Sequence, residues 1–194
     1  MRDRLQAELG SVRYSGFLCY LMGPYSTFDV EALDQELRGT NDRYAIETEC
    51  DDSVDEMLAL LRRLQGRLRT DPGVNAFLAI DAGIPLEAMD AATQSIEFAR
   101  ASNAVAFVVP HPGDNLSVGL EVGGVLEDQY PESDRLLVVH EKVVTSAMLD
   151  AVSDRWDARL ATYADEADLA EQLRRFVAEI MYRESTGRLP RKDR

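Results

Sequence analysis

Five short apolar runs, separated by segments with helical periodicity, constrain the fold of this chain more than any other feature. The clearest, Phe17–Met22, is continuously apolar and is bounded by glycines, as is typical of a strand buried on both faces. Strands that alternate with helices form βαβ units, which build a parallel sheet covered by helices on both sides. We therefore predict a Rossmann-like three-layer α/β sandwich with a five-stranded, mainly parallel sheet, whose other strands are Ala76–Ile80, Ala104–Val109, Leu136–Val139 and Arg159–Tyr163.

Apolar residues at steps of three and four predict the helices between these strands. The last helix has the clearest stripe, formed by Leu169, Leu173, Phe176, Val177, Ile180 and Met181. Earlier helices are predicted over residues 53–68, 86–100 and 118–126. We interpret residues 28–52 as a polar excursion and the basic residues 185–194 as a mobile tail, which leaves a single domain over residues 1–184.

The chain carries a strong excess of negative charge. It has 35 acidic and 21 basic residues, a formal net charge of −14, and only two lysines, Lys142 and Lys192. Such a surface repels nucleic-acid phosphates and argues against DNA or RNA binding. Acidity combined with arginine in place of lysine indicates adaptation to high salt, where dense ions screen the self-repulsion. We expect a protein of the salt-rich cytoplasm of a halophilic archaeon.

Few residues suit metal, disulfide or membrane chemistry. Cys19 and Cys50 are too few and too isolated for a disulfide framework or a zinc cluster, and two histidines argue against a metal site. No apolar stretch reaches transmembrane length, and the polar start is not a signal peptide. Neither a dinucleotide-binding glycine motif nor a P-loop is present. We expect a soluble cytoplasmic protein with no cofactor, no metal and no membrane partner.

In parallel α/β sheets, ligands bind at the carboxyl ends of the strands, near the point where the strand order reverses. The segments predicted to lie there are residues 23–29, 81–83 and 111–121. The run CYLMGPYSTFD, residues 19–29, breaks from an apolar strand into two aromatic residues. Tyr25 or Phe28 could stack on a nucleobase.

The stretch PHPGDNLSVGLEVGGVLED, residues 110–128, places Glu121 in the first turn of a predicted helix, where the helix dipole favours the ionised carboxylate. An ionised carboxylate beside a cleft can attack or stabilise an oxocarbenium-like sugar centre. Alternatively, Glu121 is an ordinary residue at the start of a helix, and the neighbouring glycines only allow close packing. Asp81 also has two interpretations, because it could transfer protons or cap its own loop.

Taken together, these stretches resemble the nucleoside 2-deoxyribosyltransferase family, in which a strand leads into Gly-Pro-Tyr/Phe-Ser and a later helix carries Gly-x-Glu-x-Gly. The resemblance covers about residues 16–140, and TIR-type NAD-cleaving domains have a related layout. It implies a flavodoxin-like sheet, cleavage of an N-glycosidic bond, Glu121 as the nucleophile and Asp114 as a looser match to the aspartate before it. The candidate substrate-binding residues are Gly23, Pro24, Tyr25, Ser26, Phe28, His111 and Gly119.

One departure from this family concerns proton transfer. The family's aspartate in the helix before the third strand corresponds here to a position near Ala92, and Asp81 is a candidate substitute. Three functions follow. One is a transferase or hydrolase of nucleosides or nucleotides, and the second is a non-catalytic module that binds a nucleotide-like ligand in signalling. The third is an interface role that has replaced chemistry. Because family members commonly complete each site with a neighbouring subunit, we expect a homo-oligomer.

Overall fold

The five predicted strands form one sheet in the computed structural model of the chain, which describes residues 1–23, 52–110, 123, 125–128, 130–143, 155 and 157–192. The strands are β1 (Tyr14–Met22), β2 (Val74–Phe77), β3 (Ala104–Val109), β4 (Leu136–Glu141) and β5 (Arg159–Tyr163). Helices whose full extent lies within these residues are α1 (Arg2–Leu9), α3 (Asp52–Thr70), α4 (Ala91–Ala101) and α7 (Glu166–Ser185), with the 3-10 helices η1 (Ala79–Ala82) and η2 (Tyr130–Arg135).

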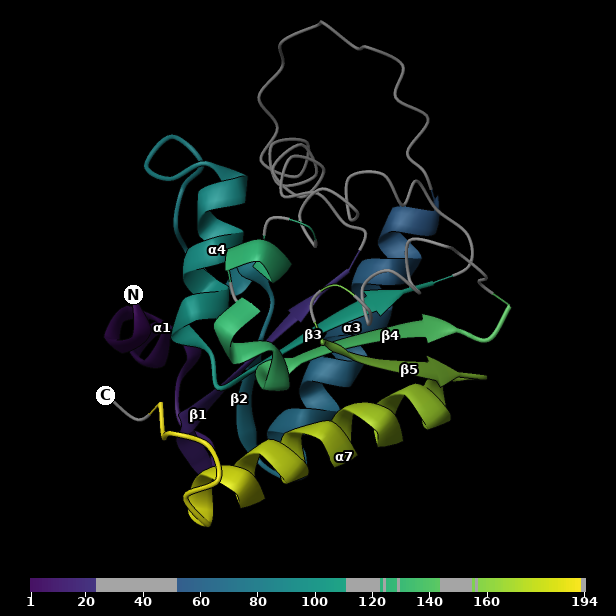
Figure 1. The fold of residues 1–194 in the computed structure, drawn as a ribbon. Helices are drawn as coiled ribbons and strands as arrows, with labels where there is room; N and C mark the ends of the chain where they lie inside the picture. The colour runs from purple at the N-terminus through teal and green to yellow at the C-terminus, as the bar shows by residue number, and fades with distance from the viewer. Residues whose placement is uncertain are drawn as a thin grey trace, which may run out of the picture.

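All strands run parallel, in the order β2-β1-β3-β4-β5 (Figure 1). This is the flavodoxin-like order, in which β2 lies on one side of β1 and the later strands lie on the other. The order therefore reverses between β1 and β3. The predicted flavodoxin-like α/β fold, with its parallel sheet, is confirmed.

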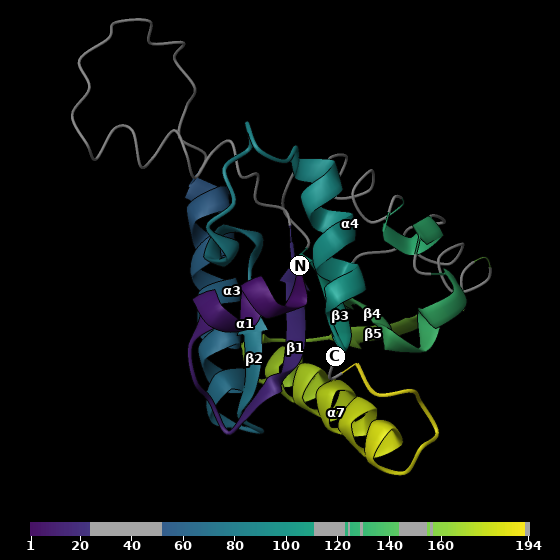
Figure 2. The same ribbon diagram turned by 90° about the vertical axis from the view of Figure 1, so that its left-hand side faces the viewer.

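Helices cover the sheet on both faces, because neighbouring side chains along each buried strand point in opposite directions (Figure 2). Leu18 and Tyr20 of β1 pack with α1 and α4, on what we call the α4 face. Cys19 and Leu21 pack with α3 and α7, on the α7 face. The two faces together make the sheet the middle of three layers.

The α7 stripe is buried as its periodicity predicted. Asp165 begins the helix as its N-cap, accepting a hydrogen bond from the Asp168 backbone N–H at 2.9 Å. Each large apolar side chain that leaves water here contributes about 1.5–3 kcal/mol. The buried members of the stripe are Leu169, Leu173, Phe176, Val177 and Ile180.

Two element boundaries differ from the predicted ones for local reasons. The second strand was predicted to reach Ile80, but β2 ends at Phe77 and η1 follows, because the Asp81 carboxylate accepts from the Leu78 backbone N–H at 2.8 Å. Helix α4 begins at Ala91 instead of near residue 86. Its N-cap, Asp90, accepts from the Thr93 N–H at 3.0 Å and so fixes the start.

The two ends of the described chain pack against the domain. Sequence reasoning missed α1, whose only buried residues are Leu5 and Leu9. The tail was predicted to be mobile from residue 185, but Leu189 packs on the α7 face and Lys192 lies 2.5 Å from Glu132. These contacts hold the tail against the domain as far as Lys192.

Candidate functional site

The carboxyl ends of β1 and β3 lie side by side at the reversal point of the sheet. Met22, the last residue of β1, pairs with Phe107 of β3. Gly23 and Pro110 follow these strands, so the two segments that carry the GPYS and GLEVGG motifs depart from neighbouring strand ends. This is the position where doubly wound sheets bind ligands.

Most of the predicted site residues lie outside the described part of the chain. Of all the predicted site residues, the structure describes only Gly23 and Asp81. The structure therefore brings together the starting points of the two motif segments, while the positions of their side chains stay predictions. The predicted site residues outside the described ranges are Pro24, Tyr25, Ser26, Phe28, His111, Asp114, Gly119 and Glu121.

Gly23 is needed for packing against α3. A Cβ atom at this position would lie 2.8 Å from Cδ1 of Leu61, which is itself fully buried. The glycine thus lets the end of β1 approach α3 closely. Its predicted role at the floor of a ligand pocket is a separate matter and stays a prediction.

Asp81 is held in place by its own surroundings. Besides capping Leu78, its carboxylate accepts from Gln65 Nε2 at 2.7 Å and forms an ion pair with Arg62. These contacts match the loop-capping interpretation of Asp81. A carboxylate that already accepts from three donors has little capacity left for proton transfer.

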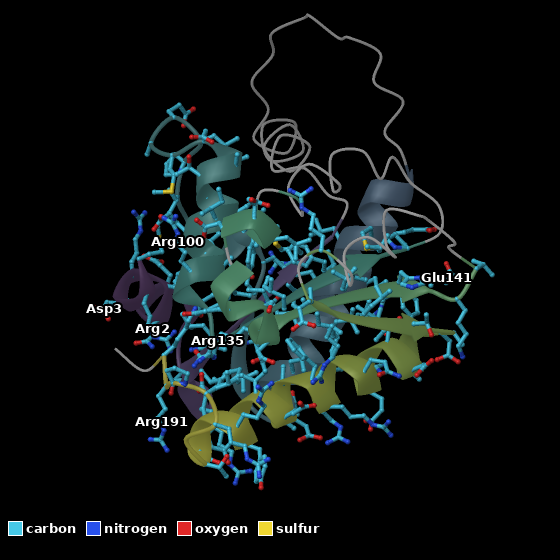
Figure 3. All side chains as sticks on the ribbon, viewed as in Figure 1. Arg2, Asp3, Arg100, Arg135, Glu141 and Arg191 are labelled. Carbon is cyan, nitrogen blue, oxygen red and sulfur yellow. The ribbon has the colours of Figure 1, made fainter. Side chains whose placement is uncertain are left out.

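His140 and Glu141 end β4 on the same edge of the sheet, where Figure 3 shows Glu141. His140 is buried, with Nδ1 3.0 Å from the Glu141 carbonyl oxygen. On the next strand, burial raises the pKa of Tyr163 to about 12, with a smaller contribution from Glu141. The sequence places His140 directly after the fourth predicted strand, with two interpretations, an acid or base at this edge or ordinary polar surface.

The first turn of α4 carries no acid in the position that the family resemblance requires. Ala92 is exposed there. Asp90 precedes it and accepts from both the backbone N–H and the Oγ1 of Thr93, which lowers the pKa of this aspartate. Glu97, the acid within α4, pairs with Arg100 at 2.7 Å.

The opposite edge of the sheet holds a buried polar network that sequence reasoning missed. Arg135 Nη1 lies 2.6 Å from Glu184 Oε1, and Asn103 donates to both oxygens of that carboxylate at 3.0 Å. Arg2 also donates to Asn103 Oδ1 at 2.8 Å. Figure 3 shows Arg2 and Arg135 at this edge, away from Glu141. The network joins α1, the turn before β3, η2 and α7, and its role is structural.

A groove of about 630 Å³ lies between α3 and α7, away from the carboxyl edge. Leucines from both helices form its apolar part, and Gly66 and Ala170 leave it open. Its arginines are engaged: Arg63 and Arg67 pair with Glu166, at 2.9 and 3.2 Å, and Arg174 pairs with Glu171 at 2.8 Å. The groove is large, but its arginines are paired with carboxylates and leave no charge to recognise a ligand, so we do not assign the site to it.

Other chemistries find little support among the described residues. Burial raises the pKa of the Cys19 thiol to about 12, so this cysteine is protonated and unreactive. Within the described ranges, no three His, Cys, Asp or Glu residues gather as metal ligands do. A search of the same ranges for a long apolar helix that could cross a bilayer finds none.

The fold and edge described above define a flavodoxin-like α/β domain. The chain belongs to the family described as a domain of unknown function, DUF7509, whose model matches residues 2–193. No curated protein matches the sequence significantly. Among solved structures, the chain is similar to the crystal structure of the IL-17 receptor B SEFIR domain, with 9% sequence identity and a TM-score of 0.39. That match covers 83% of this chain and 96% of the other.

Proposed function

We propose that this protein cleaves the N-glycosidic bond of a nucleoside or nucleotide, as a transferase or hydrolase, at the carboxyl edge of β1 and β3. One observation carries the proposal: the pairing of Met22 with Phe107, which makes two distant motif segments start at adjacent strand ends. Independent segments that converge on the reversal point are the usual components of a ligand site in this fold.

The chemistry assigned to the site depends on Glu121. A carboxylate at the sugar carbon can form a covalent intermediate or stabilise an oxocarbenium-like ion. Gly123 and residues 125–128 are helical, which supports a helix close to Glu121 in sequence. Val125 and Leu126 pack on the α4 face, so the helical residues 125–128 cover this face of the sheet.

Release of free base tests this proposal directly. Wild-type protein in high salt would be incubated with the four 2′-deoxynucleosides, their 5′-monophosphates and NAD, and free base would be measured by chromatography. We expect Glu121→Gln to abolish release. The matched control is Glu127→Gln, because Glu127 lies in the helical residues 125–128, is exposed and pairs with Arg155 across 3.8 Å. Equal release by wild type and Glu121→Gln contradicts the role of Glu121.

A second candidate function is binding without catalysis. The observation that favours it is the first turn of α4, where Asp90 is occupied as a cap and Ala92 offers no acid. Removing a general acid typically costs a factor of about 10²–10⁴ in rate. A binding module would gain thermal stability from a nucleotide without releasing base, so a thermal-shift screen of the same compounds distinguishes the two functions.

Assembly also belongs to the proposal. We infer a homo-oligomer, because the resemblance implies that a neighbouring subunit completes each site. Light scattering coupled to size-exclusion chromatography gives the mass directly, and a mass of 21.6 kDa for the eluting species would contradict the inference.

A further inference from the structure

His140 occupies the strand end next to the reversal point. It pairs with Val109, the last residue of β3, and with Thr162 of β5. The segment that carries the GLEVGG motif begins just beyond Val109. His140 therefore lies at the same edge as the proposed site, one strand away from the pairing of β1 with β3.

The His140 side chain faces the side of the sheet on which Val125 and Leu126 pack. Alternation along β4 places His140 on the same side as Leu136 and Val138, which pack on the α4 face. Val125 and Leu126 pack on this face too. An imidazole that is only 8% exposed here interrupts a strand whose other core positions are all apolar.

Within the described residues, one ring nitrogen of His140 has a hydrogen-bond partner and the other has none. Nδ1 lies 3.0 Å from the Glu141 carbonyl oxygen, and because a carbonyl only accepts, the hydrogen bond places a proton on Nδ1. Nε2 forms no hydrogen bond with any residue in the described ranges.

We propose that His140 is the catalytic acid of the N-glycosidic reaction, an assignment that rests on the proposed function. As the bond between the sugar carbon and the base nitrogen breaks, its electron pair goes to the base. The Nε2 proton of the imidazolium passes to the leaving base, which departs neutral. The attacking water or the incoming base then returns a proton to Nε2, so the imidazolium is restored.

This assignment supplies the group that the α4 helix lacks. Asp90 caps α4, Glu97 pairs with Arg100, and Asp81 accepts from three donors. Each of these acids is committed to a structural contact. An imidazole is suited to the role because its unperturbed proton affinity lies near neutral pH.

The leaving group provides a test specific to acid catalysis. The base of 7-methyl-2′-deoxyguanosine is already cationic and leaves without gaining a proton, whereas that of 2′-deoxyguanosine needs one. We expect His140→Gln to slow base release from 2′-deoxyguanosine by about 100-fold or more, and release from the methylated compound by less than about tenfold. His140→Asn is the companion variant, because its amide can still donate to the Glu141 carbonyl, and the same pattern is expected.

Thermal unfolding of both variants would establish that they fold. Equal slowing of the two substrates, or no slowing of either, would overturn the assignment, since a structural role does not depend on the leaving group. If wild type releases no base at all, the proposed function fails separately. A second measurement then decides: with only two histidines, the His140 Cε1–H resonance is assigned by its loss in His140→Gln. No shift of that resonance with 2′-deoxyguanosine or its 5′-monophosphate would overturn a role for His140 at the site.

Discussion

Replacing Glu184 by glutamine is expected to destabilise the domain strongly, because the change leaves a buried positive charge without its main partner. The Arg135 side chain is 3% exposed and that of Glu184 is 9% exposed. Glutamine has nearly the same shape as glutamate, so it removes the charge while retaining most of the packing. Arg135 would keep its hydrogen bond to the Asn103 carbonyl, at 2.9 Å, but not the carboxylate.

The expected loss is about 3 kcal/mol in the free energy of unfolding. Breaking one side of a buried ion pair typically costs about 3–5 kcal/mol. The lower end applies here, because Glu132 also lies 3.3 Å from the Arg135 guanidinium and is 46% exposed, so it compensates in part. In a chain of this length, about 3 kcal/mol corresponds to a fall of about 6–12 °C in Tm.

Equilibrium urea unfolding would measure this loss, with Asp134→Asn as the matched control. Asp134 pairs with Arg183 through two contacts, both at 2.8 Å, but its side chain is 55% exposed. Exposed pairs contribute about 0–1 kcal/mol. If Glu184→Gln loses no more stability than Asp134→Asn, the argument that burial makes the Arg135 pair important is refuted.

Three further predictions concern packing, salt and acid. Gly23→Ala should lower the free energy of unfolding by about 1–3 kcal/mol, because the new methyl group forces Leu61 to move. Gly66→Ala has open space around the new methyl group and should stabilise α3 by about 0.5–1 kcal/mol. Urea unfolding compares the two variants, and equal effects would contradict the close approach at Gly23. Raising KCl from about 0.1 M to about 2 M should raise Tm, because ions screen a net charge of −14, and a falling Tm would argue against salt adaptation. Hydrogen bonds from Arg174 and Arg175 lower the pKa of Glu171 to about 2. The contribution of Glu171 to stability is therefore complete above its ordinary pKa of 4.5 and is lost as pH falls through about 2. Glu171→Gln should lose less stability than wild type over this pH interval, and parallel losses would refute the assignment.

The sheet could be predicted because its signal is local. Continuous apolar runs such as Ala104–Val109 identify buried parallel strands, and the boundaries of β3 and β5 match the prediction. The apolar stripe of α7 gives an equally clear signal, since six apolar residues repeat at steps of three and four. Helix α1 escaped prediction because two buried leucines in eight residues give too weak a pattern, and contacts with distant residues hold it in place.

The candidate site was predictable as an edge but less so as a set of residues. The carboxyl ends of parallel strands meet by topology, which is why Gly23 and Pro110 were expected to lie near each other. Whether an acid caps a turn or faces a ligand depends on partners that are distant in sequence. Asp81 shows this, since Arg62 and Gln65 belong to α3. His140 gave no signal beyond its position, because its burial depends on both neighbouring strands.

The central claim is that ligand recognition takes place where β1 and β3 end, and backbone amide chemical shifts test it most directly. Isotope-labelled protein would be titrated with the 2′-deoxynucleosides and their 5′-monophosphates. The account predicts shifts at Met22, Gly23 and Val109, with none at Leu18 or Asn103 on the opposite edge. Shifts confined to the opposite edge or to the groove between α3 and α7, or no shift with any of these compounds, would contradict it.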